Sequence, residues 1–208
     1  ANPNCSTIQM VLALKEIHKS FIIDRIVVST YQSVTGTGAA AVKQMMDERN
    51  EIESDKVYPH PIDKNCFPHG GDFLPNGYTT EEIKLVDETR KIFNSPEIKV
   101  TATVVRIPVI GGHSMAVNVN TKKPFKIEEI YDAFEATPGV IIKNDNLNFD
   151  YPMPLTAHER NEVFVGRIRE DNTIENGLNM WIVADNLRKG AATNAVQIAE
   201  YLINNKLV

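Results

Sequence analysis

Apolar residues recur along the chain with two spacings, one typical of helices and one typical of strands. Near the start they repeat every three or four positions, at Ile8, Val11 and Leu14. This spacing predicts an amphipathic helix that begins near Cys5. Residues 21–31 are mostly β-branched and apolar, so they predict a buried strand directly after that helix.

The next segments predict two more helices separated by a long irregular stretch. An alanine-rich helix is expected to run from the glycine-containing turn after the first strand to about Glu53. Residues 54–78 are rich in proline and turn-forming residues, and a structured excursion of this length is often functional. Thr79 and Glu82 have the spacing of a capping box, which predicts a helix up to about Asn94. Its buried stripe should contain Leu85, Val86, Ile92 and Phe93.

The second half of the chain mixes strands and helices without strict alternation. This order favours an α+β fold, in which a mixed or antiparallel sheet carries helices packed on one face. Strands are expected at residues 98–109, 114–120, near 140, 163–169 and 178–183, and helices at residues 127–135 and 187–204.

The composition narrows the class of protein without identifying it. The 208 residues carry a net charge of -5, so no overall positive field favours nucleic acid, and no apolar run approaches the length of a membrane span. Cys5 and Cys66 are the only cysteines, which favours a reducing, cytoplasmic location over a disulfide scaffold. The chain opens on Ala1 without an initiator Met, and we expect it to be a fragment of a longer protein.

Cys5 is the first candidate for chemistry. A thiol at a helix N-terminus lies at the positive end of the helix dipole, beside free N–H groups that favour a thiolate and can hold an oxyanion. A buried structural cysteine is an equally common alternative. Cys66 and His69 have the spacing of a metal-ligand pair, but only His60 is close by, so we expect no metal site.

Other polar residues fall on predicted strands and helices. His113 follows two glycines, which let the backbone approach a ligand closely, and it could exchange a proton with a thiol. A solvent-exposed turn histidine is the more common alternative. Arg106 shares a strand face with apolar residues and needs an anionic partner, either a structural carboxylate or a substrate. Glu81 and Lys84 share one helix face, as a surface ion pair or as a site for a zwitterionic, phosphorylated substrate.

A short glycine motif follows the first predicted strand. Gly36 and Gly38, with Ala41 after them, superficially match a dinucleotide-binding fingerprint. No clear parallel strand with an acidic end follows the helix, which argues against that interpretation. A glycine loop beside a cofactor phosphate or nicotinamide is the alternative.

Taken together, five segments of the chain resemble aspartate-semialdehyde dehydrogenases, in the order that this family has them. The likeness covers nearly the whole chain, and its motifs are specific in combination rather than singly. It implies the fold of the C-terminal domain of glyceraldehyde-3-phosphate dehydrogenase. The segments are Asn2-Pro3-Asn4-Cys5-Ser6-Thr7; Ser29-Thr30-Tyr31-Gln32-Ser33-Val34-Thr35-Gly36-Thr37-Gly38; Glu81-Glu82-Ile83-Lys84; Arg106-Ile107-Pro108-Val109 with Gly112-His113-Ser114; and Asp185-Asn186-Leu187-Arg188-Lys189-Gly190-Ala191-Ala192.

The resemblance also implies roles for single residues. Cys5 is the expected nucleophile that forms an acyl-thioester, Gln32 helps to orient the acyl group, and His113 relays the proton. The expected substrate ligands are Glu81 for the α-amino group, Arg106 for the α-carboxylate, Lys84 for phosphate, and Asn4. Contacts to the cofactor NADP are expected at Thr35, Gly36, Gly38, Pro68 and Asn186. Cys5, Arg106 and His113 should therefore share one pocket.

The reaction that the resemblance implies is the NADP-dependent reductive dephosphorylation of L-4-aspartyl phosphate to L-aspartate 4-semialdehyde. Its product serves lysine, threonine, methionine and diaminopimelate biosynthesis, and we expect a homodimer or a dimer of dimers. Family members begin with a nucleotide-binding Rossmann domain, and nothing in these 208 residues corresponds to it. We expect residues 1–185 to be the catalytic and dimerisation domain, and residues 186–208 to form a helix that packs on the missing domain. The chain alone should then be inactive.

Two other interpretations stay open. N-acetyl-glutamyl-phosphate reductases use the same thioester chemistry but carry Gly-Cys-Tyr, and glyceraldehyde-3-phosphate dehydrogenases carry Ser-Cys-Thr-Thr, whereas this chain has Asn4-Cys5-Ser6. The alternative from a different class is a non-catalytic dimerisation fragment. A reactive, low-pKa Cys5 would support catalysis, and an inert one would support a scaffold.

Overall fold

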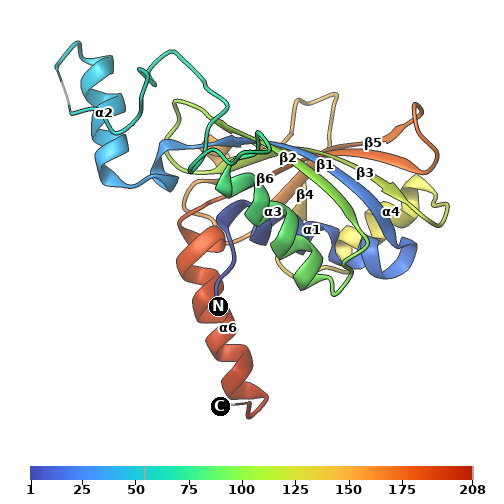
Figure 1. Ribbon diagram of the computed structural model, residues 1–208. Coiled ribbons are helices and arrows are strands. Elements are labelled where there is room, and N and C mark those ends of the chain that lie inside the picture. Colours follow the sequence, from blue (N-terminus) through green and yellow to red (C-terminus); the bar gives the residue numbers. More distant parts are fainter. Residues whose placement is uncertain (54, 208) are drawn as a thin grey trace.

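A mixed sheet of six strands lies at the centre of the computed structural model, which describes residues 1–53 and 55–207 (Figure 1). The strands are β1 (Ile23–Gln32), β2 (Lys99–Arg106), β3 (His113–Thr121), β4 (Val140–Ile142), β5 (Val163–Asp171) and β6 (Gly177–Ala184). They lie in the order β2-β1-β3-β6-β5-β4, with β1 parallel to β2, β4 parallel to β5, and the other pairs antiparallel. The predicted α+β class with a mixed sheet is confirmed.

Three of the helices pack on one face of this sheet. The helices are α1 (Cys5–Phe21), α2 (Ala39–Arg49), α3 (Thr80–Ile92), α4 (Ile127–Glu135), α5 (Pro154–Ala157) and α6 (Thr193–Asn204). Apolar residues of α1, α3 and α4 form one core with the strand residues that point toward them. In β1, Ile26 and Val28 are buried in that core, whereas Val27 and Ser29 point to the opposite face and are partly exposed. This period of two is the one expected of a strand with a single fully covered face.

The predicted capping box starts α3. The Thr79 hydroxyl accepts from the backbone N–H of Glu82 at 3.3 Å, and the Glu82 carboxylate accepts from the backbone N–H of Thr79 at 2.7 Å. Leu85 and Val86 are buried as expected. The expectation for Ile92 is wrong, because this side chain is 43% exposed and lines a groove between α1, α3 and α6 instead of the core.

The proline-rich excursion and α2 form a small unit that projects from one end of the sheet (Figure 1). The described part of the excursion, residues 55–78, packs Tyr58, Ile62 and Phe67 against α2 in a second apolar cluster, and the predicted first residue of this segment, Ser54, lies outside the described residues. The helix ends at Arg49 rather than near Glu53. Its end is set by Glu51, whose φ of 59° is a left-handed conformation that terminates helices.

The C-terminal helix is interrupted near its start. In place of one helix from Leu187, a five-residue π-helical segment (Arg188–Ala192) precedes α6. The α6 helix extends away from the sheet and has no buried residue (Figure 1). Its first turn lies beside the N-terminus, because Asn194 Nδ2 donates to Asn2 Oδ1 at 2.7 Å. Among the helices in the described part of the chain, none has the length and apolar character needed to cross a membrane.

Candidate active site

Four strand ends meet at one edge of the sheet. β1 and β2 end at the paired residues Gln32 and Arg106, and the antiparallel strand β3 begins beside them at His113. β6 ends at Ala184, which pairs with His113. Parallel strands end at the same edge of a sheet, and their antiparallel neighbours begin there. Residues that are far apart in the sequence are therefore brought together at this edge.

The N-terminus of α1 carries Cys5 as its first residue. Asn4 caps this helix, because its side-chain oxygen accepts from the backbone N–H groups of Ser6 at 2.9 Å and Thr7 at 3.3 Å. Asn4 is itself held by α3, since its backbone N–H donates to Glu88 Oε2 at 2.8 Å. The helix N-terminus and the thiol are thus fixed relative to the start of α3.

The surroundings of Cys5 favour a neutral thiol in the free protein. Burial raises the pKa of Cys5 to about 11, and the Glu81 carboxylate adds to this rise. The backbone N–H of Ser6, the Arg106 guanidinium and the Ser6 hydroxyl lower that pKa, but by less. The stabilisation of a thiolate that we expected at the helix N-terminus is therefore present and is outweighed by burial.

His113 is fully buried and neutral. Its Nδ1 accepts from the backbone N–H of Ser33 at 3.1 Å, and burial together with the nearby Arg106 lowers its pKa to about 3. A neutral imidazole whose Nδ1 accepts carries its proton on Nε2. This Nε2 has no hydrogen-bond partner among the described residues, and it faces Gly36, where a Cβ atom would lie 3.1 Å away. The geometry leaves one N–H free to serve a ligand.

Arg106 and Glu81 place opposite charges beside Cys5 and His113. Arg106 is 5% exposed, its Nη1 donates to the Ser33 carbonyl at 2.9 Å, and its Nη2 lies 3.7 Å from Glu81 Oε2. Its Nε is buried without a partner in the described part of the chain. Glu81 reaches this group from the first turn of α3. The pair suits a molecule that carries both an ammonium and a carboxylate.

The segment after β1 meets the segment after β6 through side chains. Asn186 Oδ1 lies 3.0 Å from Thr35 Oγ1 and 3.2 Å from Ser33 Oγ, and the two hydroxyls also lie within hydrogen-bond distance of each other. Because the two hydroxyls carry one proton each, two of these three hydrogen bonds form at a time. Gly36 follows directly, against Arg106 Nη1 and the His113 ring. Three of the residues expected at the cofactor (Thr35, Gly36 and Asn186) are therefore placed together, next to His113.

Three expected site residues lie farther out. Lys84 is exposed one turn along α3 from Glu81. Gly38, with φ 107°, precedes α2, and a Cβ atom added there would have open space around it. Pro68 is exposed beside Phe67, whose backbone pairs with that of Arg106. In the described part of the chain, none of the three forms a hydrogen bond with Cys5 or His113.

Sequence reasoning missed Ser33 and Asp185. Ser33 binds His113 through its N–H, Arg106 through its carbonyl and Asn186 through its hydroxyl. Asp185 is 2% exposed and accepts from the backbone N–H groups of Glu159, Leu187 and Arg188, which lower its pKa although burial opposes the shift. Both lie within the motifs quoted above, and their position directly after a strand was the available signal.

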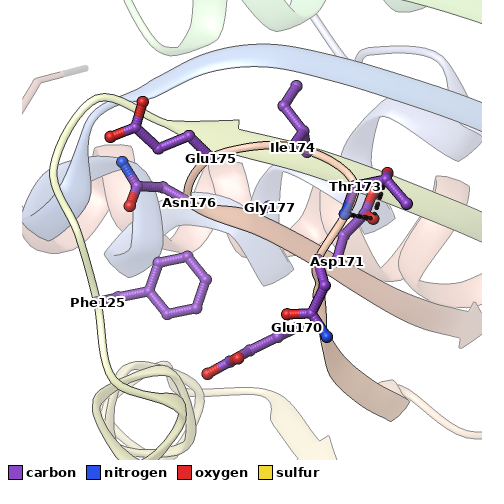
Figure 2. Close-up of a pocket in the computed structure, with 9 residues that line it drawn as sticks. Phe125, Glu170, Asp171, Thr173, Ile174, Glu175, Asn176 and Gly177 are labelled. Atoms are coloured by element: carbon purple, nitrogen blue, oxygen red, sulfur yellow. Dashed lines mark hydrogen bonds between the residues drawn. The ribbon is translucent and has the colours of Figure 1, made fainter.

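A separate hollow lies at the opposite end of β3 and β6. This hollow has a volume of about 400 Å³. Figure 2 shows the residues that line it, Phe125 and residues 170–177. Asn120 pairs with Gly177 there, seven residues along β3 from His113. None of its lining residues is among the residues that meet at the Cys5, Arg106 and His113 end of the sheet, so it is not part of the site.

Comparison with known proteins defines the class. The family model "Semialdehyde dehydrogenase, dimerisation domain" matches residues 14–189, and the chain belongs to this family. Within it, the chain is similar to aspartate-semialdehyde dehydrogenases. It is 51% identical to that of Aquifex aeolicus over 214 residues, and 44% identical to that of Bacillus subtilis over 222 residues. Both alignments cover 100% of this chain but only 63% and 64% of the relatives.

Solved structures agree with this placement. The aspartate semialdehyde dehydrogenase II of Vibrio cholerae, described as complexed with ASA, has a TM-score of 0.92 and 46% identity, covering 98% of this chain and 62% of that one. An enzyme of Candida albicans, solved with NADP, shares the fold with a TM-score of 0.74 and 24% identity. The predicted resemblance, and the fold it implied, are confirmed.

Proposed function

We propose that this chain supplies the thiol, substrate-binding and dimerisation part of an enzyme that converts L-4-aspartyl phosphate to L-aspartate 4-semialdehyde with NADPH. The observation that carries the proposal is the convergence of Cys5, Arg106 and His113 at one edge of the sheet. Family membership supports it. The chain spans less than two thirds of its relatives, so the activity is proposed for the longer protein that contains it.

In the first half of the reaction, the Cys5 sulfur attacks the acyl carbon of the substrate. The carbon–sulfur bond forms as the bond from the acyl carbon to the phosphate oxygen breaks, and the thiol proton leaves on the departing phosphate. The products are a thioester and hydrogen phosphate, which balances atoms and charge. Splitting the reaction in this way replaces one difficult step with two easier ones.

In the second half, a thioester, a hydride and a proton give an aldehyde and a free thiol. NADPH, when bound, supplies the hydride. His113 is proposed to relay this proton from solvent: the ring takes up a proton as it passes one from Nε2, the buried ring nitrogen without a protein partner among the described residues, and it ends the step neutral. A positioned acid of this kind contributes roughly 10²–10⁴-fold to a rate.

Substrate recognition is proposed for the charged pair and its neighbours. Glu81 would bind the α-amino group and Arg106 the α-carboxylate, which replaces their long mutual contact of 3.7 Å with two closer ion pairs. Lys84 would bind the phosphate from the exposed side of α3, and Asn4 would line the site beside Cys5. Gln32 would orient the acyl group at the end of β1.

The nicotinamide end of NADP is proposed to lie over Gly36. The site fits this group in two respects. Gly36 leaves open the space where a Cβ would touch Arg106 and His113, and Thr35, Ser33 and Asn186 offer hydroxyl and amide groups to a carboxamide. Gly38 and Pro68 would contact the cofactor farther from the reacting carbon.

The open face of the sheet is proposed as the homodimer surface, in keeping with the dimerisation-domain family. Tyr31 and Trp181 lie on this face with ring centroids 5.4 Å apart, and both are partly exposed. Val27 and Ala116 add a small apolar area between polar groups. A measurement of molecular mass in solution would distinguish this homodimer from a dimer of dimers.

Residues 1–185 are proposed as the catalytic and dimerisation domain, and the described part of the following segment, residues 186–207, as a contact to another part of the longer protein. The α6 helix supports this division, because Val196, Tyr201 and Ile203 are more than half exposed on it. We expect a polypeptide of these 208 residues alone to bind NADP weakly and to show no turnover.

A non-catalytic dimerisation module is the second candidate function. The observation that favours it is the raised pKa of Cys5, since a neutral thiol is a poor nucleophile. The deciding experiment measures NADPH oxidation that depends on aspartyl phosphate in the full-length protein and in its Cys5→Ala variant. Activity that disappears in the variant supports the enzyme, and activity unchanged by the substitution refutes the proposed role of Cys5.

A further inference from the structure

The turn that leads into His113 contains two glycines, Gly111 and Gly112, with φ of 71° and 78°. Both are buried against α5 and its C-cap. A Cβ atom added at residue 111 would overlap the ring of His158. A Cβ atom added at residue 112 would lie 2.9 Å from the Cα atom of Pro154. The two glycines therefore let this segment pack directly on the main chain that leads into the imidazole.

His158 is held over this turn by Asp185. Its Nδ1 lies 3.1 Å from Asp185 Oδ2, and the Asp185 side chain is 2% exposed. Burial raises the pKa of Asp185, but hydrogen bonds from backbone N–H groups and from His158 lower it overall, so the carboxylate is ionised and can only accept. The His158 Nδ1 is therefore the donor, and this charge-assisted hydrogen bond orients the ring.

The residue after His158 is bound to the same carboxylate. The φ of Glu159 is 59°, in the left-handed region that a residue with a side chain adopts only at a cost. Its backbone N–H donates to Asp185 Oδ2 at 2.7 Å. Backbone strain of this kind persists where the surrounding contacts hold it, and here the contact is to the carboxylate that orients His158.

Asp185 also holds the segment on the other side of the site. Its Oδ1 accepts from the backbone N–H groups of residues 187–188 at 2.8 and 2.9 Å, and its carbonyl accepts from the N–H of Gly190 at 3.0 Å. Gly190 lies against Cys5, since an added Cβ atom would be 3.0 Å from the Cys5 Cβ. One residue thus joins the turn before His113 to the segment that packs on the nucleophile.

We propose that His158 and Asp185 are positioning residues: Asp185 orients the His158 ring, and the ring holds the turn that places His113. Both act through His113 rather than on the substrate. A displacement of about 1 Å at a reacting group can cost roughly a hundredfold in rate, so a contact of this kind matters for turnover. The effect on turnover rests on the proposed function, whereas the effect on the turn does not.

The first experiment examines the turn without any substrate. Amide hydrogen exchange of the full-length protein is followed by mass spectrometry in two peptides. One contains Gly111 and His113, and the other contains Ser33, whose N–H donates to His113 Nδ1. We expect His158→Ala to speed exchange in both peptides by roughly tenfold or more and to leave the peptide around Thr79 unchanged. Equal exchange in the variant and the wild-type protein would overturn the proposal.

The second experiment measures turnover in the full-length protein. His158→Ala should lower kcat by roughly tenfold or more and change KM for aspartyl phosphate by less than about threefold, because Arg106 and Glu81 keep their places. His158→Asn should stay within about threefold of the wild-type kcat, because its amide nitrogen takes the place of Nδ1 and can donate to Asp185. An equal loss in both variants would overturn the role of the hydrogen bond. His60→Ala, at an exposed histidine of the excursion, is the matched control and should leave both constants unchanged.

A third variant tests whether the two residues act as one unit. In Asp185→Asn the amide nitrogen cannot accept from both His158 and Glu159, so we expect the exchange and kcat of His158→Ala, and no further loss in the double variant. Additive losses would refute the joint role. Because the His158 side chain is 39% exposed, its substitution leaves the core in place and keeps the test valid if Asp185→Asn does not fold.

The outcomes separate this proposal from the proposed function. Faster exchange in His158→Ala, in a protein whose wild-type form has no dehydrogenase activity, would refute the proposed function alone. An active enzyme in which His158→Ala leaves exchange unchanged would refute only the roles of His158 and Asp185. Faster exchange with an unchanged kcat would show that the contact holds the turn without positioning His113 for the reaction, and would also overturn the proposal.

Discussion

Gly36 faces His113 so closely that a Cβ atom at residue 36 would lie 3.1 Å from the imidazole Nε2. This is the nitrogen that carries the free proton, so the missing side chain is what keeps the proton accessible. The backbone of Gly36 is not in the left-handed region. An alanine there would crowd the neighbouring side chains without straining the main chain.

We therefore predict that Gly36→Ala lowers kcat/KM at least tenfold while the free energy of unfolding changes by less than about 1 kcal/mol. The added methyl group would crowd His113 and Arg106 at the position proposed for the nicotinamide. Steady-state kinetics and chemical denaturation of the full-length protein check both parts. Ala40→Ser, a change at an exposed position of the same segment, should leave both quantities unchanged, and wild-type kinetics in Gly36→Ala would contradict the assignment.

The buried His113 should make the protein less stable in acid. Its pKa is lowered to about 3 in the folded state, whereas an unfolded histidine titrates near 6.5. Between these values the unfolded chain binds the proton and the folded protein does not, so the free energy of unfolding falls as the pH falls. His113 alone should remove about 2 kcal/mol between pH 7.5 and pH 5.

The measurement is chemical denaturation of the wild-type protein and His113→Gln at both pH values. The variant should lose about 2 kcal/mol less than the wild-type protein over this interval, because its side chain does not titrate. Parallel losses in the two proteins would mean that His113 is not held neutral by burial.

Arg106→Lys should impair substrate binding more than the chemical step. The guanidinium contacts the Ser33 carbonyl and Glu81 with different nitrogens, and an ammonium cannot reproduce this fork. We expect KM for aspartyl phosphate to rise at least tenfold, with a change in kcat of less than about threefold. Arg49→Lys is the matched control, since Arg49 binds Asp63 on the surface at 2.9 Å. A loss of kcat without a rise in KM in Arg106→Lys would contradict the binding role.

Glu82→Ala should destabilise the fold by about 2–3 kcal/mol. The Glu82 carboxylate accepts from the backbone N–H of Thr79 and, with its other oxygen, from that of Val104 at 2.9 Å, so its loss leaves two buried donors without a partner. Urea denaturation checks the value. Glu128→Ala, at an exposed position in the first turn of α4, is the control, and a loss as small as that of the control would show that water replaces both contacts.

The sequence predicted most helices and strands because the interactions that start and orient them join residues close together in the chain. The capping box of Thr79 and Glu82 depends on adjacent residues, and so does the burial of Val104 and Arg106 between more exposed neighbours. Both predictions are confirmed. The exposure of Ile92 was not predictable in the same way. Helical spacing shows which residues share a face, but not how far along the helix that face stays covered.

The site could be predicted only in part for a related reason. The motif residues pointed to Cys5, Arg106 and His113, but the ionisation of Cys5 depends on burial and on Glu81, which is 76 positions later in the chain. Ser33 was missed because its importance comes from three partners on separate segments. Contacts of this kind are made by the tertiary fold and leave no periodic signal in the sequence.

The register in which β1 pairs with β2 and β3 also links the position of Gln32 to the stability of the core. Gln32 points to the same side of β1 as Ile26 and Val28, which are locked in the hydrophobic core. A slip of β1 by one residue would turn Gln32 to the opposite face and expose both aliphatic side chains to water. A misplaced Gln32 thus comes with a large loss of folding free energy, and molecules with this error are removed from the folded population.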